Sequence, residues 1–363
     1  MNRGTNSNLM KESNKKLVLN LIRQSEFSRA DISRETGLTK AAVTIIADEL
    51  IKNNIVFENE PLPQGVGRRP VKLSINYNSF YAVGINISRS KYNVGIINLN
   101  GDVLISESGR TENPEILIKK LNKIVENQIK SLNIEEENLL GIGITTPGPV
   151  NYKENKILCP PNFRQWHNIS IKESDFILPV SLENVANAYA LSEKYFGVCQ
   201  KDDNYLLLLV DEGVGSGIIV EGKIYRGNKG LGNELGHNSI DYRGLACECG
   251  NCGCLEMYAS IPNILAGTLH ESWNAVVDKN DVAIMKKEAE YLASGLTNAL
   301  NLFDFDKIII AGDIAYKPKM LIKRLKGLIN ERVITKTDIE IKVSPEQNNI
   351  KIAGSIIINT FYL

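Results

Sequence analysis

The sequence lacks the features of an exported or membrane-bound protein. No apolar run in its 363 residues is long enough to cross a bilayer, and no hydrophobic signal core follows Met1. We therefore expect a cytoplasmic protein with no membrane partner. The six cysteines fit that compartment, because four of them cluster as in a metal site, while Cys159 and Cys199 are most simply buried thiols.

Net charge is also absent, because 42 Lys and Arg balance 42 Asp and Glu, so the whole-chain charge does not indicate a nucleic-acid partner. The distribution of charge says more. Residues 1–78 carry 12 Lys and Arg against 8 Asp and Glu, whereas the remaining residues carry 30 against 34. A chain of this length forms two or three domains. A basic head on an acidic body indicates that only the head contacts phosphate groups.

The first 78 residues show the pattern of a winged helix-turn-helix domain. Apolar residues at 17–22 predict a first amphipathic helix. The segment 28–31, Ser-Arg-Ala-Asp, predicts the capped start of a short second helix. Gly37 then permits a tight turn, and Thr39 caps a third helix. The order of these signals favours this domain over the alternative, an unrelated three-helix bundle with a solvated basic face.

The third helix is the expected recognition helix, because one face carries short or basic side chains that fit a major groove. The residues predicted to face DNA from this helix are Thr39, Lys40, Ala41 and Thr44, with Ala47 on the same face. Segments 55–58 and 71–75 predict a β-hairpin, the wing. Arg68 and Arg69 at its base are expected to contact the DNA backbone or minor groove.

From residue 79 onward the pattern changes to two similar α/β halves. Strands are expected in the first half at 81–87, 92–99, 103–105 and 139–144, with a helix at 114–132. In the second half we expect strands at 205–210, 217–220, 223–225 and 307–310, with helices at 282–302 and 318–330. The residues alone therefore predict two α/β lobes.

The densest cluster of reactive side chains lies between Glu234 and Glu256. His237 and four cysteines fall within eighteen residues of this segment. Thiolate and imidazole groups on a short, glycine-punctuated loop can close a tetrahedral zinc shell. That shell leaves the two carboxylates free for a polar ligand. The alternatives are a pair of disulfides, which nothing else in the chain supports, and a histidine that merely fills the loop.

The motif Glu-x-Gly-His, followed by Cys-x-Cys-Gly-x-x-Gly-Cys-x-Glu, resembles that of the ROK family of sugar kinases and sugar-responsive repressors. The resemblance covers residues 79–363 and implies a two-lobed, actin-like (ribonuclease-H-like) α/β body. The first lobe would span 79–183, with the C-terminal helix returning to it, and the second 184–363. The implied ligands of a structural zinc ion are His237, Cys247, Cys249 and Cys254. Cys252 falls where the family pattern is open, so it is a spare thiol or exchanges with Cys254.

The resemblance further implies that a sugar binds between the lobes. Carboxylates and amides hold sugars because they accept from and donate to neighbouring hydroxyl groups. The implied sugar-binding residues are Asn184, Glu234, His237 and Glu256, bordered by Gly148 and Asn162. Zinc would act indirectly by fixing the loop that presents these groups, and His237 would serve the metal through one ring nitrogen and the sugar through the other.

The family's kinases carry phosphoryl-transfer groups that this chain lacks. Where they have Asp-x-Gly-Gly-Thr, residues 86–90 read Asn-Ile-Ser-Arg-Ser, so the acid is an amide and both glycines carry side chains. Val185 stands where they have a catalytic Asp, and residues 311–313 read Ala-Gly-Asp instead of three glycines. Only the glycine-rich segment 213–217 remains, and it is also typical of a hairpin turn. We therefore expect no catalytic residues.

These patterns lead to the hypothesis of a sugar-responsive repressor of carbohydrate-utilisation genes, most like the family's xylose-repressor branch. Its expected partners are operator DNA, bound by a homodimer or a dimer of dimers, and a monosaccharide effector. One alternative is an ATP-dependent sugar kinase with an appended DNA-binding head. Another is a regulator whose body binds a protein, although intact Glu234 and His237 favour a sugar.

Overall fold

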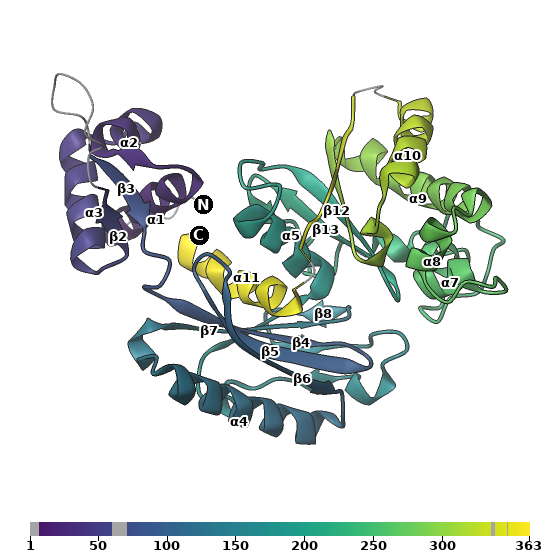
Figure 1. Cartoon of the computed structure of the whole chain (residues 1–363), viewed down its shortest axis with the longest axis horizontal. Coiled ribbons are helices and arrows are strands. Elements are labelled where there is room, and N and C mark those ends of the chain that lie inside the picture. Colours follow the sequence, from purple (N-terminus) through teal and green to yellow (C-terminus); the bar gives the residue numbers. More distant parts are fainter. Residues whose placement is uncertain (1–6, 60–70, 335–337, 347) are drawn as a thin grey trace.

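The computed structural model describes residues 7–59, 71–334, 338–346 and 348–363 (Figure 1). The predicted wing residues Arg68 and Arg69 lie outside the described residues. A small head is followed by two lobes, each built on a five-stranded mixed sheet. No helix within the described ranges is long and apolar enough to span a membrane.

The head has the predicted order of helices and hairpin. Its second helix begins at a capping box, in which the side chains of Ser28 and Asp31 each accept a hydrogen bond from the other's backbone N–H. Gly37 ends that helix at φ 72°, a left-handed conformation that glycine adopts without strain. Thr39 caps the third helix, as predicted. The elements are α1 (Ser7–Gln24), β1 (Phe27–Ser28), α2 (Arg29–Thr36), α3 (Lys40–Lys52), β2 (Val56–Glu58) and β3 (Lys72–Ile75), with sheet order β1-β3-β2.

The first lobe is a sheet of order β11-β7-β4-β5-β6 between two helices, with α4 on one face and the C-terminal helix α11 on the other (Figure 1). A Cβ atom on Gly84 would lie 2.0 Å from the carbonyl oxygen of Ile350, so glycine is what allows α11 to approach the sheet this closely. Its elements are β4 (Tyr81–Ile87), β5 (Lys91–Asn98), β6 (Val103–Arg110), α4 (Pro114–Leu132), η1 (Glu136–Asn138), β7 (Leu139–Thr146), β11 (Val180–Asn184) and α11 (Asn349–Tyr362).

Between β7 and β11 the chain forms a small antiparallel sheet of order β10-β9-β8. It consists of β8 (Val150–Asn151), β9 (Lys156–Ile157) and β10 (Ile169–Ser170), with short 3₁₀ turns η2 (Arg164–Trp166) and η3 (Glu173–Asp175).

The second lobe is a sheet of order β14-β13-β12-β15-β16. Its elements are α5 (Val185–Phe196), β12 (Tyr205–Val210), β13 (Val214–Val220), β14 (Lys223–Ile224), η4 (Leu235–His237), α6 (Glu256–Ala259), α7 (Ile261–Leu265), α8 (Trp273–Asp278), α9 (Val282–Phe303), β15 (Lys307–Ala311), η5 (Asp313–Ala315), α10 (Lys319–Arg332) and β16 (Glu340–Val343). The two five-stranded sheets thus bear out the two predicted α/β halves, although β13 begins earlier than expected.

Helices α5 and α11 lie side by side between the two sheets (Figure 1). Their apolar residues join one core with the inner face of the second sheet and with the apolar residues of the head. Separate cores lie between the first sheet and α4 and between the second sheet and α9. The head therefore packs against the same pair of helices that fills the space between the lobes.

The glycine-rich segment 213–217 forms the turn before β13 and the start of that strand. A Cβ atom on Gly217 would lie 2.3 Å from the carbonyl oxygen of Ala186 in α5. This glycine therefore allows α5 to pack directly on β13. Helix packing explains Gly217, so the glycine does not indicate a nucleotide-binding loop.

Candidate functional site

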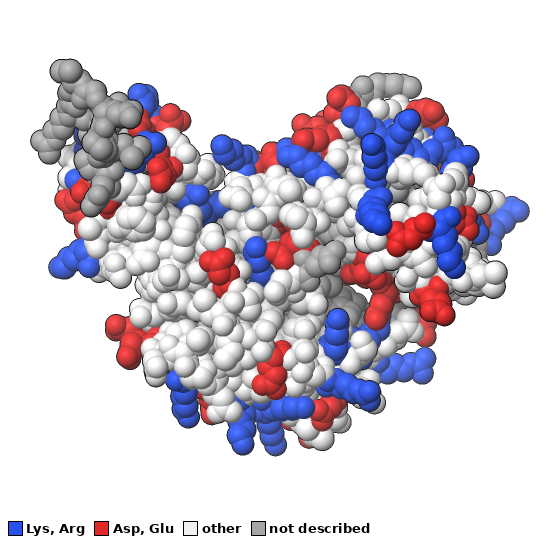
Figure 2. All heavy atoms as spheres, in the orientation of Figure 1, with Lys and Arg blue, Asp and Glu red and all other residues white. Residues whose placement is uncertain are grey.

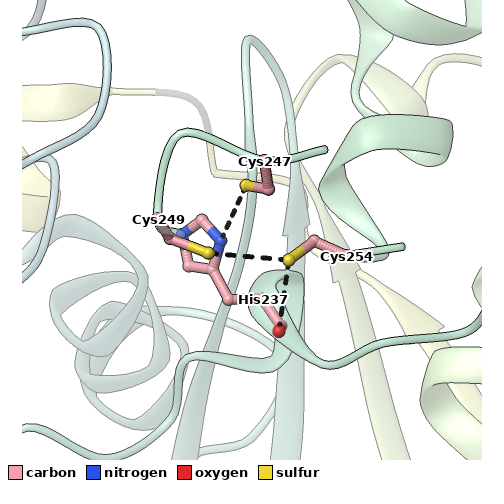
Figure 3. Close-up of side chains that lie close together, drawn as sticks. All are labelled: His237, Cys247, Cys249 and Cys254. Atoms are coloured by element: carbon pink, nitrogen blue, oxygen red, sulfur yellow. Dashed lines mark hydrogen bonds between the residues drawn. The ribbon is translucent and has the colours of Figure 1, made fainter. Parts of the chain in front are cut away.

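The four predicted metal ligands meet in one cluster in the second lobe. The ligand atoms of His237, Cys247, Cys249 and Cys254 all lie within 4.8 Å of one another. The Sγ atom of Cys247 is 3.6 Å from His237 Nδ1, and the Sγ atoms of Cys249 and Cys254 are 3.6 Å apart. Figure 3 shows the three sulfur atoms and the imidazole ring turned toward one another. Cys252 is exposed and is not part of this group.

The loop reaches this geometry because glycines permit its turns. Gly250 and Gly253 have φ values of 92° and 68°. A Cβ atom on Gly253 would lie 1.7 Å from the carbonyl oxygen of Asp241, so no other residue fits there without a shift of the backbone. Two isolated β-bridges, one between Ser239 and Cys254 and one between Ala246 and Cys252, hold the two sides of the loop together.

The donor set fits zinc, which takes three thiolates and one imidazole in tetrahedral structural sites. Burial raises the pKa of the Cys254 thiol to about 12. A bound zinc ion would lower the pKa of this thiol again, because it stabilises the thiolate. Zinc binding would in turn stabilise the folded loop.

A cavity of about 430 Å³ lies between the lobes, next to this cluster. Of the six residues predicted to bind or border a sugar, five line it: Gly148, Asn184, Glu234, His237 and Glu256. Asn162 is not among the lining residues, although its neighbour Pro161 is. Instead, the backbone N–H of Asn162 donates to Glu248 Oε2 at 3.2 Å. His237 directs Nδ1 toward Cys247, which leaves Nε2 for another partner.

The carboxylates of the cavity differ in how far their hydrogen-bonding capacity is used. Glu256 accepts from the backbone N–H of Val214 at 2.9 Å through one oxygen. The carboxyl group of Glu234 accepts from no group in the described part of the chain. Burial, and then repulsion from Glu256, raise the pKa of Glu234 to about 7. A ligand with hydroxyl groups would meet these unpaired oxygens.

Asn184 lies between β11 and α5, and the oxygen and the nitrogen of its side-chain amide have different surroundings. Its side-chain oxygen accepts from the Ala186 N–H at 2.9 Å and so caps α5. Its amide nitrogen faces Gly148, where an added Cβ atom would lie 2.3 Å from it. Gly148 therefore leaves room for the amide that faces the cavity.

Most positions that differ from the kinase pattern line the same cavity, with Ala311 as an exception. Asn86 donates to Thr145 Oγ1 at 2.9 Å. Arg89 spans the cleft, because it donates to the Pro161 carbonyl oxygen at 3.2 and 3.3 Å and pairs with Glu212 at 3.5 Å. Val185, at the start of α5, also lines the cavity. The groups replaced in this chain therefore face the place where phosphoryl transfer would occur.

Sequence reasoning missed two carboxylates at the ends of strands, the buried Glu183 and the half-buried Asp211. Glu183 of β11 accepts from Arg226 Nε and Nη2 at 2.8 and 2.7 Å, an ion pair that joins the two lobes. Asp211 directly follows β12 and lines the cavity. Its acidic side chain after a wholly apolar strand was the available signal, because binding sites gather at the carboxyl ends of parallel strands.

Helix α3, the predicted recognition helix, exposes most of the residues expected to face DNA. Thr39, Lys40 and Ala41 are exposed, while Thr44 is half-buried and donates to the Lys40 carbonyl oxygen at 2.8 Å. The expectation for Ala47 is wrong: it is fully buried in the head's core. Ala47 follows Val43 by one helical turn, so it falls on the apolar stripe of α3.

Basic side chains are not confined to the head. Figure 2 shows Lys and Arg gathered over the outer end of the second lobe, where α9 and α10 carry exposed cations at Lys286, Lys323 and Arg324. Charge alone therefore does not single out the DNA-binding part of the chain.

Comparison with known proteins agrees with the residue patterns. The model of the ROK family matches residues 82–358. The chain is 33% identical over 340 residues to the xylose repressor of Bacillus subtilis (strain 168), covering 89% of this chain and 88% of that protein. A crystal structure of a ROK family transcriptional regulator, a homolog of the E. coli MLC protein, superposes with a TM-score of 0.81 at 27% identity, covering 97% of each chain.

A ROK hexokinase from Thermus thermophilus shares the fold alone, with a TM-score of 0.62 at 24% identity. It covers 77% of this chain, whereas 97% of the hexokinase is covered. The regulator therefore matches nearly the full length of this chain, and the kinase matches only a part of it.

Proposed function

We propose, from the premise that this chain belongs to the ROK family, that it is a sugar-responsive transcriptional repressor and not a sugar kinase. A xylose repressor and a ROK transcriptional regulator match it over most of its length. The single observation that carries the proposal is the asymmetry of the cavity: its polar sugar-binding groups are present, whereas an amide and a valine stand where phosphoryl transfer requires acids.

The sugar would lie against the zinc cluster, held by Asn184, Glu234, His237 and Glu256. Glu234 has no partner of its own among the described residues, and His237 has Nε2 left after Nδ1 turns to the cluster. Zinc would hold the loop and so fix the direction of these side chains, as metal-bound histidines are fixed by their second nitrogen. Loss of the metal would then weaken sugar binding before it affected the rest of the fold.

The head would bind operator DNA as part of a homodimer. One recognition helix covers only a short half-site, so two heads on a pseudo-palindrome are the usual arrangement. Thr39, Lys40, Ala41 and Thr44 are the proposed base-edge contacts, and Arg68 and Arg69 remain the proposed contacts of the wing. Arginine suits the backbone and the minor groove because it carries a fixed charge with several donors.

The head is fastened to the body at the C-terminal ends of two helices. Arg23 of α1 donates to the carbonyl oxygens of Lys194 and Tyr195 of α5 at 3.4 and 3.5 Å. Its guanidinium group also lies 4.9 Å from the ring centre of Tyr195 and 5.4 Å from that of Tyr362. Asn20 donates to the Tyr362 carbonyl oxygen at 2.6 Å. Positive charge is favourable here, because helix C-termini carry partial negative charge.

Helix α5 connects this junction with the sugar cavity. Its N-cap, Asn184, lines the cavity, and its last turn carries Lys194 and Tyr195. A sugar that favours one arrangement of the lobes would therefore act on a helix whose far end holds the head. A ligand shifts such an equilibrium only by its different affinity for the two states. We infer that the sugar-bound arrangement misplaces the two heads on the operator and weakens repression.

The test combines sugar binding, DNA binding and catalysis on the full chain. A thermal-shift screen of monosaccharides, xylose first, identifies the effector, because a ligand that binds only the folded state raises the melting temperature. We expect the effector to weaken operator binding in a fluorescence-anisotropy titration, and no sugar phosphorylation with ATP. Measurable phosphorylation, or equal operator affinity with and without every sugar, would contradict the proposal.

The same titration tests the DNA interface. Lys40→Ala should weaken operator binding about tenfold and relax the choice of site, since loss of one good base contact costs about 1–3 kcal/mol. Lys52→Ala is the matched control, because Lys52 is exposed at the other end of α3. Equal effects of the two variants would show that α3 does not read the operator.

A further inference from the structure

The cavity is larger than a single sugar ring requires. It measures about 430 Å³, whereas a hexose at the packing density of an organic crystal fills roughly 190 Å³. We propose that the cavity binds a neutral saccharide of two rings, with one ring at Glu234 and Glu256 and the second against Asp211, Asp313 and Asn86. This inference rests on the proposed function, because it assumes that the first ring is a sugar.

One short turn joins the two halves of the cavity. The backbone N–H of Asp211 donates to the carbonyl oxygen of Gly213 at 2.9 Å, and the next residue, Val214, donates its N–H to Glu256 at 2.9 Å. A Cβ atom on Gly213 would lie 2.6 Å from Glu256 Oε2. The two carboxylates therefore flank this turn, where a side chain on Gly213 would displace the Glu256 carboxylate, and a ligand held by Glu256 extends past the turn toward Asp211.

The second half of the cavity offers hydrogen-bonding groups that the protein itself leaves unused. One oxygen of Asp211 accepts from the Asp313 N–H, and the other accepts from no described group. Asn86 is only 4% exposed, and it donates to Thr145 while its side-chain oxygen accepts from no described residue. Partial burial raises the pKa of the half-buried Asp211 to about 6. Unused acceptors beside a cavity suit a ligand rich in hydroxyl donors.

The charges of the cavity favour a neutral ligand over a phosphorylated one. Its lining contains five carboxylates, Asp211, Glu212, Glu234, Glu256 and Asp313, but only two permanent cations, Arg89 and Lys91. Arg89 is already engaged by Glu212 and the Pro161 carbonyl oxygen. A phosphate group would therefore meet repulsion from five carboxylates, with the exposed Lys91 as the one unengaged cation of the described lining, whereas carboxylates accept hydrogen bonds from adjacent sugar hydroxyl groups.

Calorimetric titration of the zinc-loaded full chain tests this inference with matched probes: xylose against xylobiose, glucose against cellobiose, and glucose 6-phosphate. We expect one disaccharide to bind at least about tenfold more tightly than its monosaccharide, since one tenfold step corresponds to about 1.4 kcal/mol, which one or two hydrogen bonds contribute. Asp313→Asn, at an exposed position, and Asp211→Asn should each reduce that ratio severalfold. Asp306→Asn, an exposed aspartate away from the cavity lining, should not.

The outcomes separate this inference from the proposed function. If a monosaccharide binds and its disaccharide binds no more tightly, the second ring has no site and the inference fails, while the repressor proposal stands. If glucose 6-phosphate binds more tightly than either disaccharide, the second half of the cavity accommodates a phosphate group, and the inference of a second sugar ring is wrong. If none of the probes binds, the proposed sugar site fails, and this inference fails with it.

Discussion

The two ends of helix α5 meet different partners. At the N-terminal end, Asn184 caps the helix with its oxygen and keeps its amide nitrogen beside the cavity, where the neighbouring Glu234 has no partner among the described residues. At the C-terminal end, the carbonyl groups of Lys194 and Tyr195 already accept from Arg23 of the head. We call the N-terminal end of α5, beside the cavity, the open end. We call the C-terminal end, whose carbonyl groups accept from Arg23, the occupied end.

This difference indicates the direction of a signal. A ligand that arrives at the open end changes the energy of one lobe arrangement, whereas the occupied end passes any movement of α5 to the head. The lobes of a kinase also close on a sugar, but closure there completes a catalytic site. In this chain Val185 stands at the start of α5, so under the proposed function closure would change how the head is held without completing a catalytic site.

Removing a zinc ligand should disturb the open end most. Cys247→Ser should reduce the zinc content from about one ion per chain to almost none and weaken sugar binding by about 10- to 100-fold, because the loop that carries His237 loses its anchor. Metal analysis and calorimetry measure the two effects. Cys252→Ser is the control, since Cys252 lies outside the four-ligand group. Normal zinc content in Cys247→Ser would remove Cys247 from the site.

Glu234→Ala tests the open end without touching the metal. We expect sugar affinity to fall about 30- to 100-fold, because a hydrogen bond to a charged group contributes about 1.5–3 kcal/mol. The variant should stay on the operator at sugar concentrations that release the wild type, as measured by anisotropy. Zinc content should be unchanged. Normal release by sugar would show that Glu234 does not face the ligand.

Arg23→Ala tests the occupied end. Sugar affinity should stay the same, while the effect of sugar on operator affinity should fall by about 5- to 10-fold, because coupling between two sites typically amounts to 1–3 kcal/mol. Anisotropy titrations with and without sugar measure this ratio. Lys223→Ala, an exposed cation on β14, is the control. If Arg23→Ala responds to sugar like the wild type, the head does not take its signal from α5.

Some of these features were predictable because each depends on residues that are close in the sequence. The capping box at Ser28, the turn at Gly37 and the spacing of the zinc ligands around Cys247 are local patterns with a direct physical meaning. Four strands of each five-stranded sheet also follow from local runs of β-forming residues, whereas the edge strands β11 and β16 were not predicted. The family resemblance then placed distant residues such as Asn184 beside the zinc loop.

Other features depend on contacts between segments that are far apart in the chain. Arg23 looks like any basic residue near the end of an amphipathic helix, and its partners Tyr195 and Tyr362 follow it by more than a hundred residues. Ala47 is small enough for either face of α3, so its burial was not evident from its type. Asn162 turns its backbone to Glu248 rather than lining the cavity, a loop conformation that no local pattern specifies.

The smallest expected effect is on the pH dependence of stability, and it concerns Asp211 in the second half of the cavity. Because burial raises the pKa of Asp211 from 3.8 to about 6, the folded state holds this proton more tightly than the unfolded state. Its contribution to stability is therefore fully present below about pH 4 and is lost as the pH rises through about 6. Asp211→Asn cannot titrate, so the unfolding free energy of the wild type should fall further across this window than that of the variant. The difference should be about 1–2 kcal/mol, because solvent at the half-buried Asp211 reduces the roughly 3 kcal/mol to which the pKa change corresponds. Urea denaturation of both proteins at a series of pH values measures this difference, with Asp306→Asn as the control. If the unfolding free energies of the wild type and Asp211→Asn change in parallel with pH, Asp211 is solvated like a surface carboxylate. It is then not the unpaired acceptor of a ligand site.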